Sequence, residues 1–274
     1  GQGLGYCSEE FKAMNRIDRK FHALRRENKK AFIAFITAGY PNLNITKKLV
    51  LEFAKIGVDI IELGVPFSDP LADGPIIQEA SQTALKRGVN LNDILNLVKD
   101  VRNDMDIPLC LMTYYNPIFC FGEENFAIKA GACGVDGIII PDLPPEEGNS
   151  FIRLANKFNL DTIFFLSPTS TRERIKFISG VSRGFIYYVS LTGVTGPRQN
   201  LPKDLTMNLK GIKKLTDKPV CVGFGVSDAE QVKSIYKIAD GVIVGSAIIK
   251  KIKENIDKPD LIKRVAKFVS GLMG

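Results

Sequence analysis

Eight short apolar runs, rich in β-branched residues, recur along the 274-residue chain and constrain its fold more than any other feature. Each run is nearly continuous in apolar residues, which is typical of parallel strands buried on both faces. The predicted strands lie at 31–37, 58–64, 108–115, 135–141, 160–166, 184–190, 219–224 and 240–245.

Helical patterns separate these runs, with apolar residues spaced to form one stripe. The predicted helices lie at 15–27, 44–56, 91–103, 146–157, 172–179, 228–237 and 259–269. Eight strands alternating with helices favour a right-handed βα repeat that closes into a single (β/α)8 TIM barrel with an extra N-terminal helix. A doubly wound open sheet is the alternative fold.

The sequence predicts one domain, because no linker or low-complexity tract interrupts residues 14–274. Residues 1–13 are interpreted as a tag or flexible extension. Two connections exceed the others in length, at 65–90 and 191–203, and both would lie at the carboxyl ends of barrel strands, where catalytic loops are found.

Composition excludes several classes of function. The net charge is +7 but the lysines are spread along the chain, so we expect no nucleic-acid partner. No apolar stretch reaches 18 residues, which predicts no membrane span. The single histidine, His22, and five cysteines without metal-ligand spacing predict no metal site, and the low cysteine count favours a reducing cytoplasm.

Two acidic positions are candidates for catalysis. Glu62 lies within an otherwise apolar strand, on the face shared by Val58 and Ile60. If that face points inward, burial would raise the pKa of Glu62 toward neutrality and suit it to proton transfer. Asp73, in the proline-rich loop with Asp69, could accept a hydrogen bond from a substrate N–H, although turn formation explains both aspartates equally well.

Three glycine-rich turns follow the last three strands and predict a phosphate site. They are Gly193–Gly196, Gly223–Gly225 and Gly245-Ser246. Glycine lets backbone amides approach an anion, and a helix that begins after Gly245 would direct its amino end at phosphate. The glycines could alternatively serve only as tight turns.

Aromatic residues could line the mouth of the barrel. Tyr187 and Tyr188 are neighbours on one strand, so one of them must point inward. Phe35, Met112 and Tyr114 could join the inward tyrosine, although ordinary core packing accounts for them equally well.

The sequence resembles a known family, the tryptophan synthase alpha subunit. The resemblance runs in order from about residue 14 to 270. Its most specific block is ELGVPFSDPLADGP at 62–75. The other blocks are FITAGYPN at 35–42, MTYYNP at 112–117, YYVSLTGVTG at 187–196, VGFGVSDAEQV at 222–232 and DGVIVGSAII at 240–249.

The resemblance implies retro-aldol cleavage of indole-3-glycerol phosphate to indole and D-glyceraldehyde 3-phosphate. It implies no cofactor in this chain, pyridoxal phosphate only in a beta-subunit partner, and an α2β2 assembly. By the same resemblance Glu62 and Asp73 are the catalytic pair, together with Tyr187. The resemblance also assigns ring packing, loop closure and phosphate contacts to a set of further positions: Phe35, Thr195, Gly196, Phe224, Gly225, Gly245 and Ser246.

Two positions depart from the family pattern, Tyr40 and Leu191, where many members have Asp and Arg. Three alternatives remain at this point: a stand-alone lyase without a beta partner, another phosphate-binding barrel such as a sugar-phosphate isomerase, and a non-catalytic metabolite-sensing activator of a partner. The paired carboxylates argue against the second and third.

Overall fold

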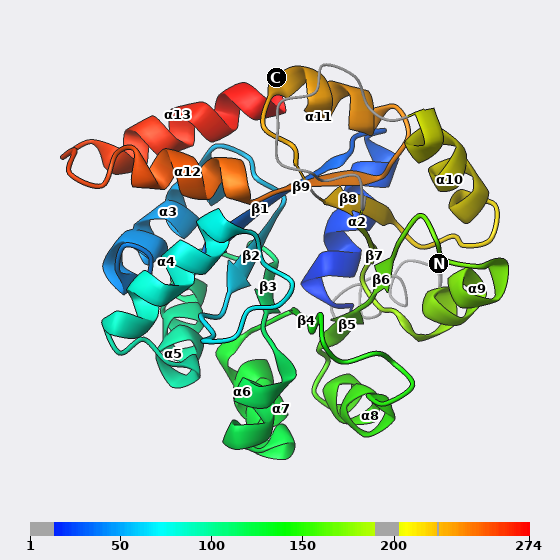
Figure 1. The fold of residues 1–274 in the computed structure, drawn as a ribbon, viewed down its shortest axis with the longest axis horizontal. Helices are drawn as coiled ribbons and strands as arrows, with labels where there is room; N and C mark the ends of the chain where they lie inside the picture. The colour runs from blue at the N-terminus through cyan, green and yellow to red at the C-terminus, as the bar shows by residue number, and fades with distance from the viewer. Residues whose placement is uncertain (1–13, 190–202, 224) are drawn as a thin grey trace, which may run out of the picture.

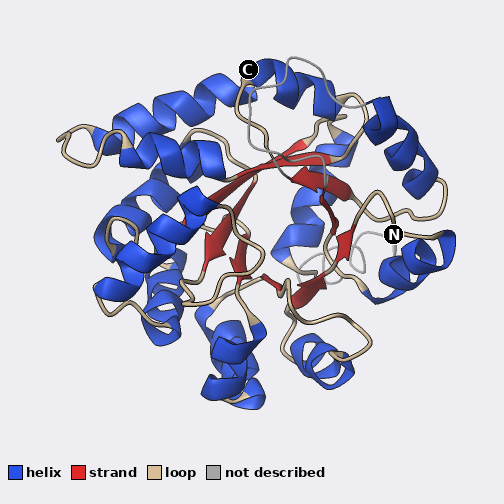
Figure 2. Ribbon diagram, viewed as in Figure 1, coloured by secondary structure: helices blue, strands red, loops and turns tan. Residues whose placement is uncertain are grey.

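The computed structural model describes residues 14–189, 203–223 and 225–274. Parallel strands occupy the centre and helices surround them (Figures 1 and 2). The described strands are β1 (Ala31–Thr37), β2 (Ile60–Gly64), β3 (Leu109–Met112), β4 (Gly137–Ile139), β5 (Asp161–Ile163), β6 (Phe165–Leu166), β7 (Ile186–Val189), β8 (Val220–Gly223) and β9 (Gly241–Val244).

The first and last strands pair with each other, so the strands form a nearly closed barrel with β5 and β6 at the two ends of the sheet. The strand order is β5-β4-β3-β2-β1-β9-β8-β7-β6, and all neighbouring strands in it run parallel. The predicted barrel is therefore confirmed, and the alternative of an open doubly wound sheet is wrong.

The fifth predicted strand, 160–166, is divided in two. β5 pairs with β4, and β6 pairs with β7, while Phe164 lies between them. The Phe164 carbonyl still accepts a hydrogen bond from the amide of Tyr187 at 3.0 Å. The described residues thus form nine short strands at the eight positions of the predicted barrel.

Helices follow the strands around the barrel. They are α2 (Arg16–Arg26), α3 (Leu43–Lys55), α4 (Pro75–Lys86), α5 (Leu91–Arg102), α6 (Tyr115–Phe121), α7 (Glu123–Cys133), α8 (Asn149–Lys157), α9 (Arg172–Val181), α10 (Lys203–Lys213), α11 (Ala229–Tyr236), α12 (Ser246–Lys253) and α13 (Leu261–Met273). Among the described helices, none is both long and apolar enough to cross a membrane.

The sequence patterns missed several of these helices. The connection 65–90 contains α4, whose buried face consists of the small residues Ala80, Ser81 and Ala84 and therefore gives a weak apolar signal. Pro75 occupies the first turn, where a proline is tolerated. Helices α6, α7 and α10 were also not predicted.

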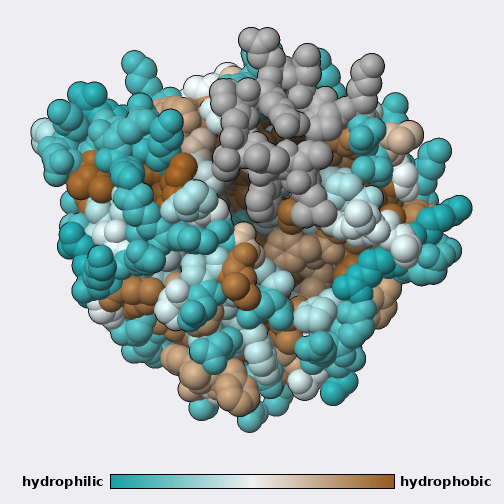
Figure 3. Space-filling model, in the orientation of Figure 1, coloured by the Kyte–Doolittle hydropathy of each residue, from teal (hydrophilic) through white to brown (hydrophobic). Residues whose placement is uncertain are grey.

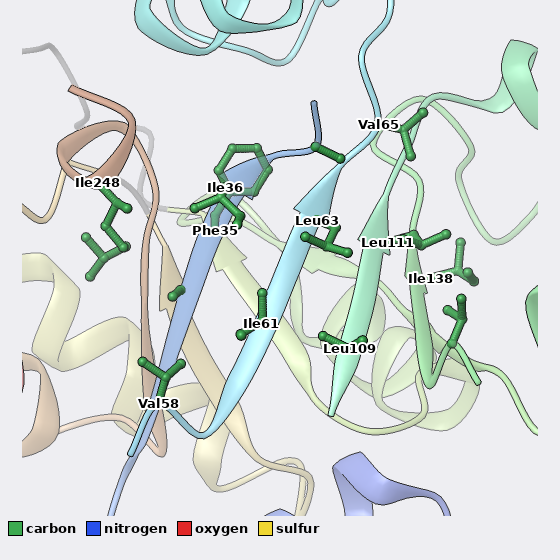
Figure 4. Packing of buried hydrophobic residues seen from close by; sticks show 14 of the residues in the cluster. Phe35, Ile36, Val58, Ile61, Leu63, Val65, Leu109, Leu111, Ile138 and Ile248 are labelled. Atoms are coloured by element: carbon green, nitrogen blue, oxygen red, sulfur yellow. The ribbon is translucent and has the colours of Figure 1, made fainter. Parts of the chain in front are cut away.

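Apolar side chains form two layers, one inside the barrel and one between the barrel and its helices. Ile61, Leu63, Leu111 and Ile138 belong to the outer layer (Figure 4). The inner layer contains Ile33, Ile60, Cys110, Ile139, Ile163, Phe185, Tyr187, Cys221 and Ile243. The alternation of side chains along each strand separates the layers.

Val58 does not share the inward face with Glu62, contrary to the sequence prediction. The strand begins only at Ile60, and Val58 packs in the outer layer. Ile60 does point inward, as the alternation predicts.

Helix α2 closes the amino-terminal end of the barrel. Asn15 caps it by accepting from the amide of Ile17 at 2.9 Å, and the Asn15 side chain donates to the carbonyls of Asp136 and Asn159, each at 2.8 Å. Ile17, Phe21 and Leu24 join the inner apolar layer. The side chains of α2 thus fill the barrel interior at this end.

Ile17→Ala is expected to lower the free energy of unfolding by about 2–4 kcal/mol, because a fully buried side chain would be truncated to a cavity. Chemical denaturation checks this. His22 lies on the exposed face of the same helix, so His22→Ala should change stability by less than about 0.5 kcal/mol. Equal effects of the two substitutions would contradict the role of α2 as the barrel's closure.

Candidate active site

Glu62 is a carboxyl group inside the apolar barrel. It lies on β2 opposite Phe35 of β1 and Cys110 of β3, and its side chain has no exposed surface. Neither carboxyl oxygen has a hydrogen-bond partner among the described residues. Burial, with a smaller contribution from the negative charge of Asp73, raises the pKa of Glu62 to about 8. Glu62 therefore holds a proton at neutral pH.

Asp73 lies in the loop after β2, next to the beginning of α4. Its carbonyl accepts a hydrogen bond from the Gln78 side chain at 2.9 Å, and its amide donates to the carbonyl of Pro70 at 3.1 Å. Burial raises the pKa of Asp73 to about 6, and a hydrogen bond from Tyr114 opposes that rise. Asp73 is therefore mostly ionised at neutral pH, unlike Glu62.

Tyr187 is the tyrosine of its pair that points into the barrel, whereas Tyr188 packs in the outer layer. Its ring lies 4.9 Å from that of Phe165, centroid to centroid, and covers Gly223 so closely that a Cβ there would be 2.5 Å from the tyrosine oxygen. Burial, then the charge of Glu62, raises the pKa of Tyr187 well above its ordinary value. The phenol is therefore neutral, and both carboxyl groups act on it electrostatically.

The ring of Phe35 lies between the end of β2, the strand that carries Glu62, and the glycine turn after β9. A Cβ on Gly64 would lie 2.5 Å from Phe35 Cζ, and a Cβ on Gly245 would lie 3.1 Å from Phe35 Cδ1. β1 stands between β2 and β9 in the sheet, so the Phe35 side chain can reach the end of both neighbours. Phe35 lies near the carboxyl end of β1 (Figure 4).

Two of the predicted glycine turns can be described. Gly225 follows β8 and has a φ of +69°, a conformation that favours glycine. Gly245 precedes α12 without a side-chain cap, and Ser246 begins the helix with its side chain exposed. The first amides of a helix have no intrahelical acceptor, so this end can bind an anion. Thr195, Gly196 and Phe224 lie outside the described residues, as does the departure at Leu191.

The face of the molecule that holds these groups is apolar at its centre and mostly hydrophilic around it (Figure 3). Leu71, in the loop between Glu62 and Asp73, is 91% exposed. An apolar centre beside an anion-binding helix end suits a ligand with one flat apolar part and one charged part.

Sequence reasoning named Tyr114 only as a possible lining residue and missed its contact with Asp73. The Tyr114 hydroxyl lies 3.2 Å from Asp73 Oδ2, and its ring stacks against Phe67 with centroids 5.1 Å apart. The two ends of this hydrogen bond are 41 residues apart, so no local pattern could reveal it. Within the described ranges, no group of three or more potential metal ligands is present.

The fold and these side chains define a (β/α)8-barrel enzyme with two carboxyl groups in different protonation states at the mouth. The family model for the tryptophan synthase alpha chain matches residues 21–272. A tryptophan synthase alpha chain from Geotalea uraniireducens is 48% identical over 94% of this chain and 97% of its own length.

Solved structures agree with the sequence relatives. Tryptophan synthase subunit alpha from Legionella pneumophila superposes with a TM-score of 0.88 at 38% identity, over 94% of this chain and 97% of that one. A chain of Mycobacterium tuberculosis tryptophan synthase has a TM-score of 0.86 at 35% identity, with the same coverage. The chain belongs to the tryptophan synthase alpha chain family.

Replacing Glu62 by the neutral Gln should make stability less dependent on pH. The folded chain keeps a proton on Glu62 up to pH about 8, whereas the unfolded chain loses it near 4.5. The contribution of Glu62 to stability is therefore full below pH 4.5 and declines as the pH rises to 8. Relative to wild type, Glu62→Gln should gain a few kcal/mol between pH 5 and 9, measured by denaturation.

Asp69→Asn provides the control, because Asp69 is exposed in the neighbouring loop. This variant should keep the wild-type decline in stability as the pH rises, because it leaves Glu62 in place. A pH-independent difference between Glu62→Gln and wild type would show that Glu62 does not titrate as a buried acid.

Proposed function

We propose that Glu62 and Asp73 are the acid–base pair that carries out the lyase reaction of this family. That reaction cleaves indole-3-glycerol phosphate to indole and D-glyceraldehyde 3-phosphate, one step of tryptophan biosynthesis. The observation that supports these roles is the buried Glu62 carboxyl, without a hydrogen-bond partner among the described residues and within electrostatic range of Asp73.

The chemistry requires a proton on the ring before the carbon–carbon bond breaks. An indole carbanion is a poor leaving group, so protonated Glu62 first delivers its proton to the ring carbon that bears the glycerol chain. Asp73, as a carboxylate, accepts a hydrogen bond from the ring N–H and stabilises the positive charge that develops there. The pKa values of about 8 and about 6 give the two groups these protonation states at neutral pH.

The second half of the reaction restores Glu62. The ionised Glu62 takes the proton of the adjacent chain hydroxyl, and the carbonyl of the aldehyde forms. The electrons of the breaking carbon–carbon bond return to the ring and neutralise the positively charged, protonated indolenine, which releases indole. Glu62 ends with a proton, as it began, so the cycle needs no further acid or base.

The remaining residues bind and orient the substrate. Tyr187 faces the reacting part of the ring from β7, and Phe35 packs against the ring from β1. The phosphate is assigned to the helix end at Gly245 and Ser246 and to Gly225, with Gly196 and Phe224 completing the site. Thr195 is assigned to closure of the loop after β7. Binding the phosphate far from the scissile bond orients the chain between the carboxyl groups.

The family works with a second subunit, and pyridoxal phosphate belongs to that beta subunit. We propose that this chain pairs with a beta subunit in an α2β2 assembly in the cytoplasm, and that its own reaction uses no cofactor. The support is the family membership of the chain, at 45–48% identity to curated alpha chains.

Glu62→Gln and Asp73→Asn should each fold normally and lose indole release by about 10²–10⁴-fold, because each removes one partner of the proton-transfer chemistry. Indole release by the purified chain, with and without a beta subunit, measures the effect. Asp69→Asn, in the same loop, should keep activity of the isolated chain close to wild type. Near-normal turnover in either site variant would remove that residue from the mechanism.

Ser246→Asp should raise KM for indole-3-glycerol phosphate about tenfold or more, because a carboxylate would stand against the phosphate at the beginning of α12. Ser246→Ala separates the charge from the lost hydroxyl and should have the smaller effect. Steady-state kinetics gives both values. An unchanged KM in Ser246→Asp would place the phosphate elsewhere.

A further inference from the structure

The Tyr114 hydroxyl joins two parts of the loop that carries Asp73. It accepts a hydrogen bond from the amide of Ala72 at 2.8 Å and lies at donor distance, 3.2 Å, from Asp73 Oδ2. One phenol oxygen thus binds the backbone and the carboxylate of adjacent residues at once.

Tyr114 itself is held in place from several sides. It lies two residues after the end of β3, at the N-cap position of α6, with an extended backbone and only 4% of its surface exposed. The Thr113 hydroxyl donates to its carbonyl at 3.1 Å, and the Phe67 ring stacks on its own. The short segment between β3 and α6 and the ring of Phe67 therefore determine where the hydroxyl lies.

The carboxylate of Asp73 has no other hydrogen-bond donor in the described part of the chain. The Tyr114 hydroxyl donates to Oδ2, whereas the Gln78 side chain donates only to the backbone carbonyl of Asp73. The second oxygen, Oδ1, is left for a donor that is not part of the described protein, and the proposed mechanism supplies one in the indole N–H.

We propose that Tyr114 is a positioning residue for this reaction: its hydroxyl fixes the Asp73 carboxylate at Oδ2 and so presents Oδ1 to the ring N–H of the substrate. The proposal rests on the proposed function, because it needs Asp73 to act on the ring nitrogen. Tyr114 acts through Asp73 and through the loop backbone at Ala72.

Several ionisable groups surround Tyr114 and Asp73, and the hydrogen bond between these two residues determines in which direction the pKa of Asp73 should move. Glu62 of β2 and Tyr187 of β7 both feel the charge of Asp73, and Asp142, in the loop after β4, acts on Tyr114. The charge of Asp73 raises the pKa of Glu62 and of Tyr187, and Asp142 contributes to the raised pKa of Tyr114. The Tyr114 hydrogen bond lowers the pKa of Asp73, so its removal should raise that pKa.

The test is Tyr114→Phe, which keeps the ring and removes the hydroxyl. The acid limb of the kcat profile for indole release should move to higher pH by roughly 0.5–1 unit. At neutral pH kcat should fall about tenfold or more while KM changes little, because the lost contact orients a catalytic group. Adding Tyr114→Phe to Asp73→Asn should lower the residual kcat no further.

Tyr115→Phe is the matched control, because the hydroxyl of Tyr115 donates to Glu123 Oε1 at 2.9 Å and not to Asp73. This variant should keep the wild-type acid limb and kcat. If Tyr114→Phe behaves like Tyr115→Phe, or lowers kcat equally with and without Asp73, the positioning role is overturned.

A second variant covers the case in which Tyr114→Phe folds poorly. A fluorinated tyrosine incorporated at position 114 is a stronger hydrogen-bond donor of nearly the same shape, so the acid limb should move to lower pH. An unmoved limb would overturn the proposal. Failure of the proposed function looks different, since wild type would then release no indole or Asp73→Asn would remain active.

Discussion

A carboxyl group without a hydrogen-bond partner among the described residues, inside an apolar barrel, is the constraint on which the proposed chemistry of this protein depends. Such a group is costly to ionise, so the barrel around Glu62 stores a proton rather than a charge. The neighbouring Asp73 is only partly buried and has a donor, and it keeps its charge. Two similar side chains thus differ in protonation because their surroundings differ.

The two ends of the barrel have separate tasks. At one end α2 inserts Ile17 and Phe21 into the inner apolar layer and completes the core. At the other end the strands finish in carboxyl groups, aromatic rings and glycine turns. Because of this separation, residues in the loops at the mouth can change with the reaction, while residues at the opposite end stabilise the fold, as in other barrels of this class.

The parts of the site that follow from strand periodicity could be predicted from sequence. Glu62 interrupts an apolar run, and alternation places it inside the barrel once the strand is recognised. Tyr187 and Tyr188 separate for the same reason. Helix α4 was missed because Ala80, Ser81 and Ala84 give little apolar contrast, and the contact of Tyr114 with Asp73 was missed because it joins two strand ends through a loop.

The ring of Phe35 lies against both Gly64 and Gly245, so substitutions at these three positions should depend on one another. A larger residue at Gly64 would overlap the tip of this ring, and one at Gly245 would need the ring to shift slightly, so a smaller residue at position 35 would relieve both contacts. Among related chains, we therefore expect the residues at these three positions either to stay the same or to change together. The geometry of a single aromatic ring in this way restricts the evolutionary paths open to two strand ends.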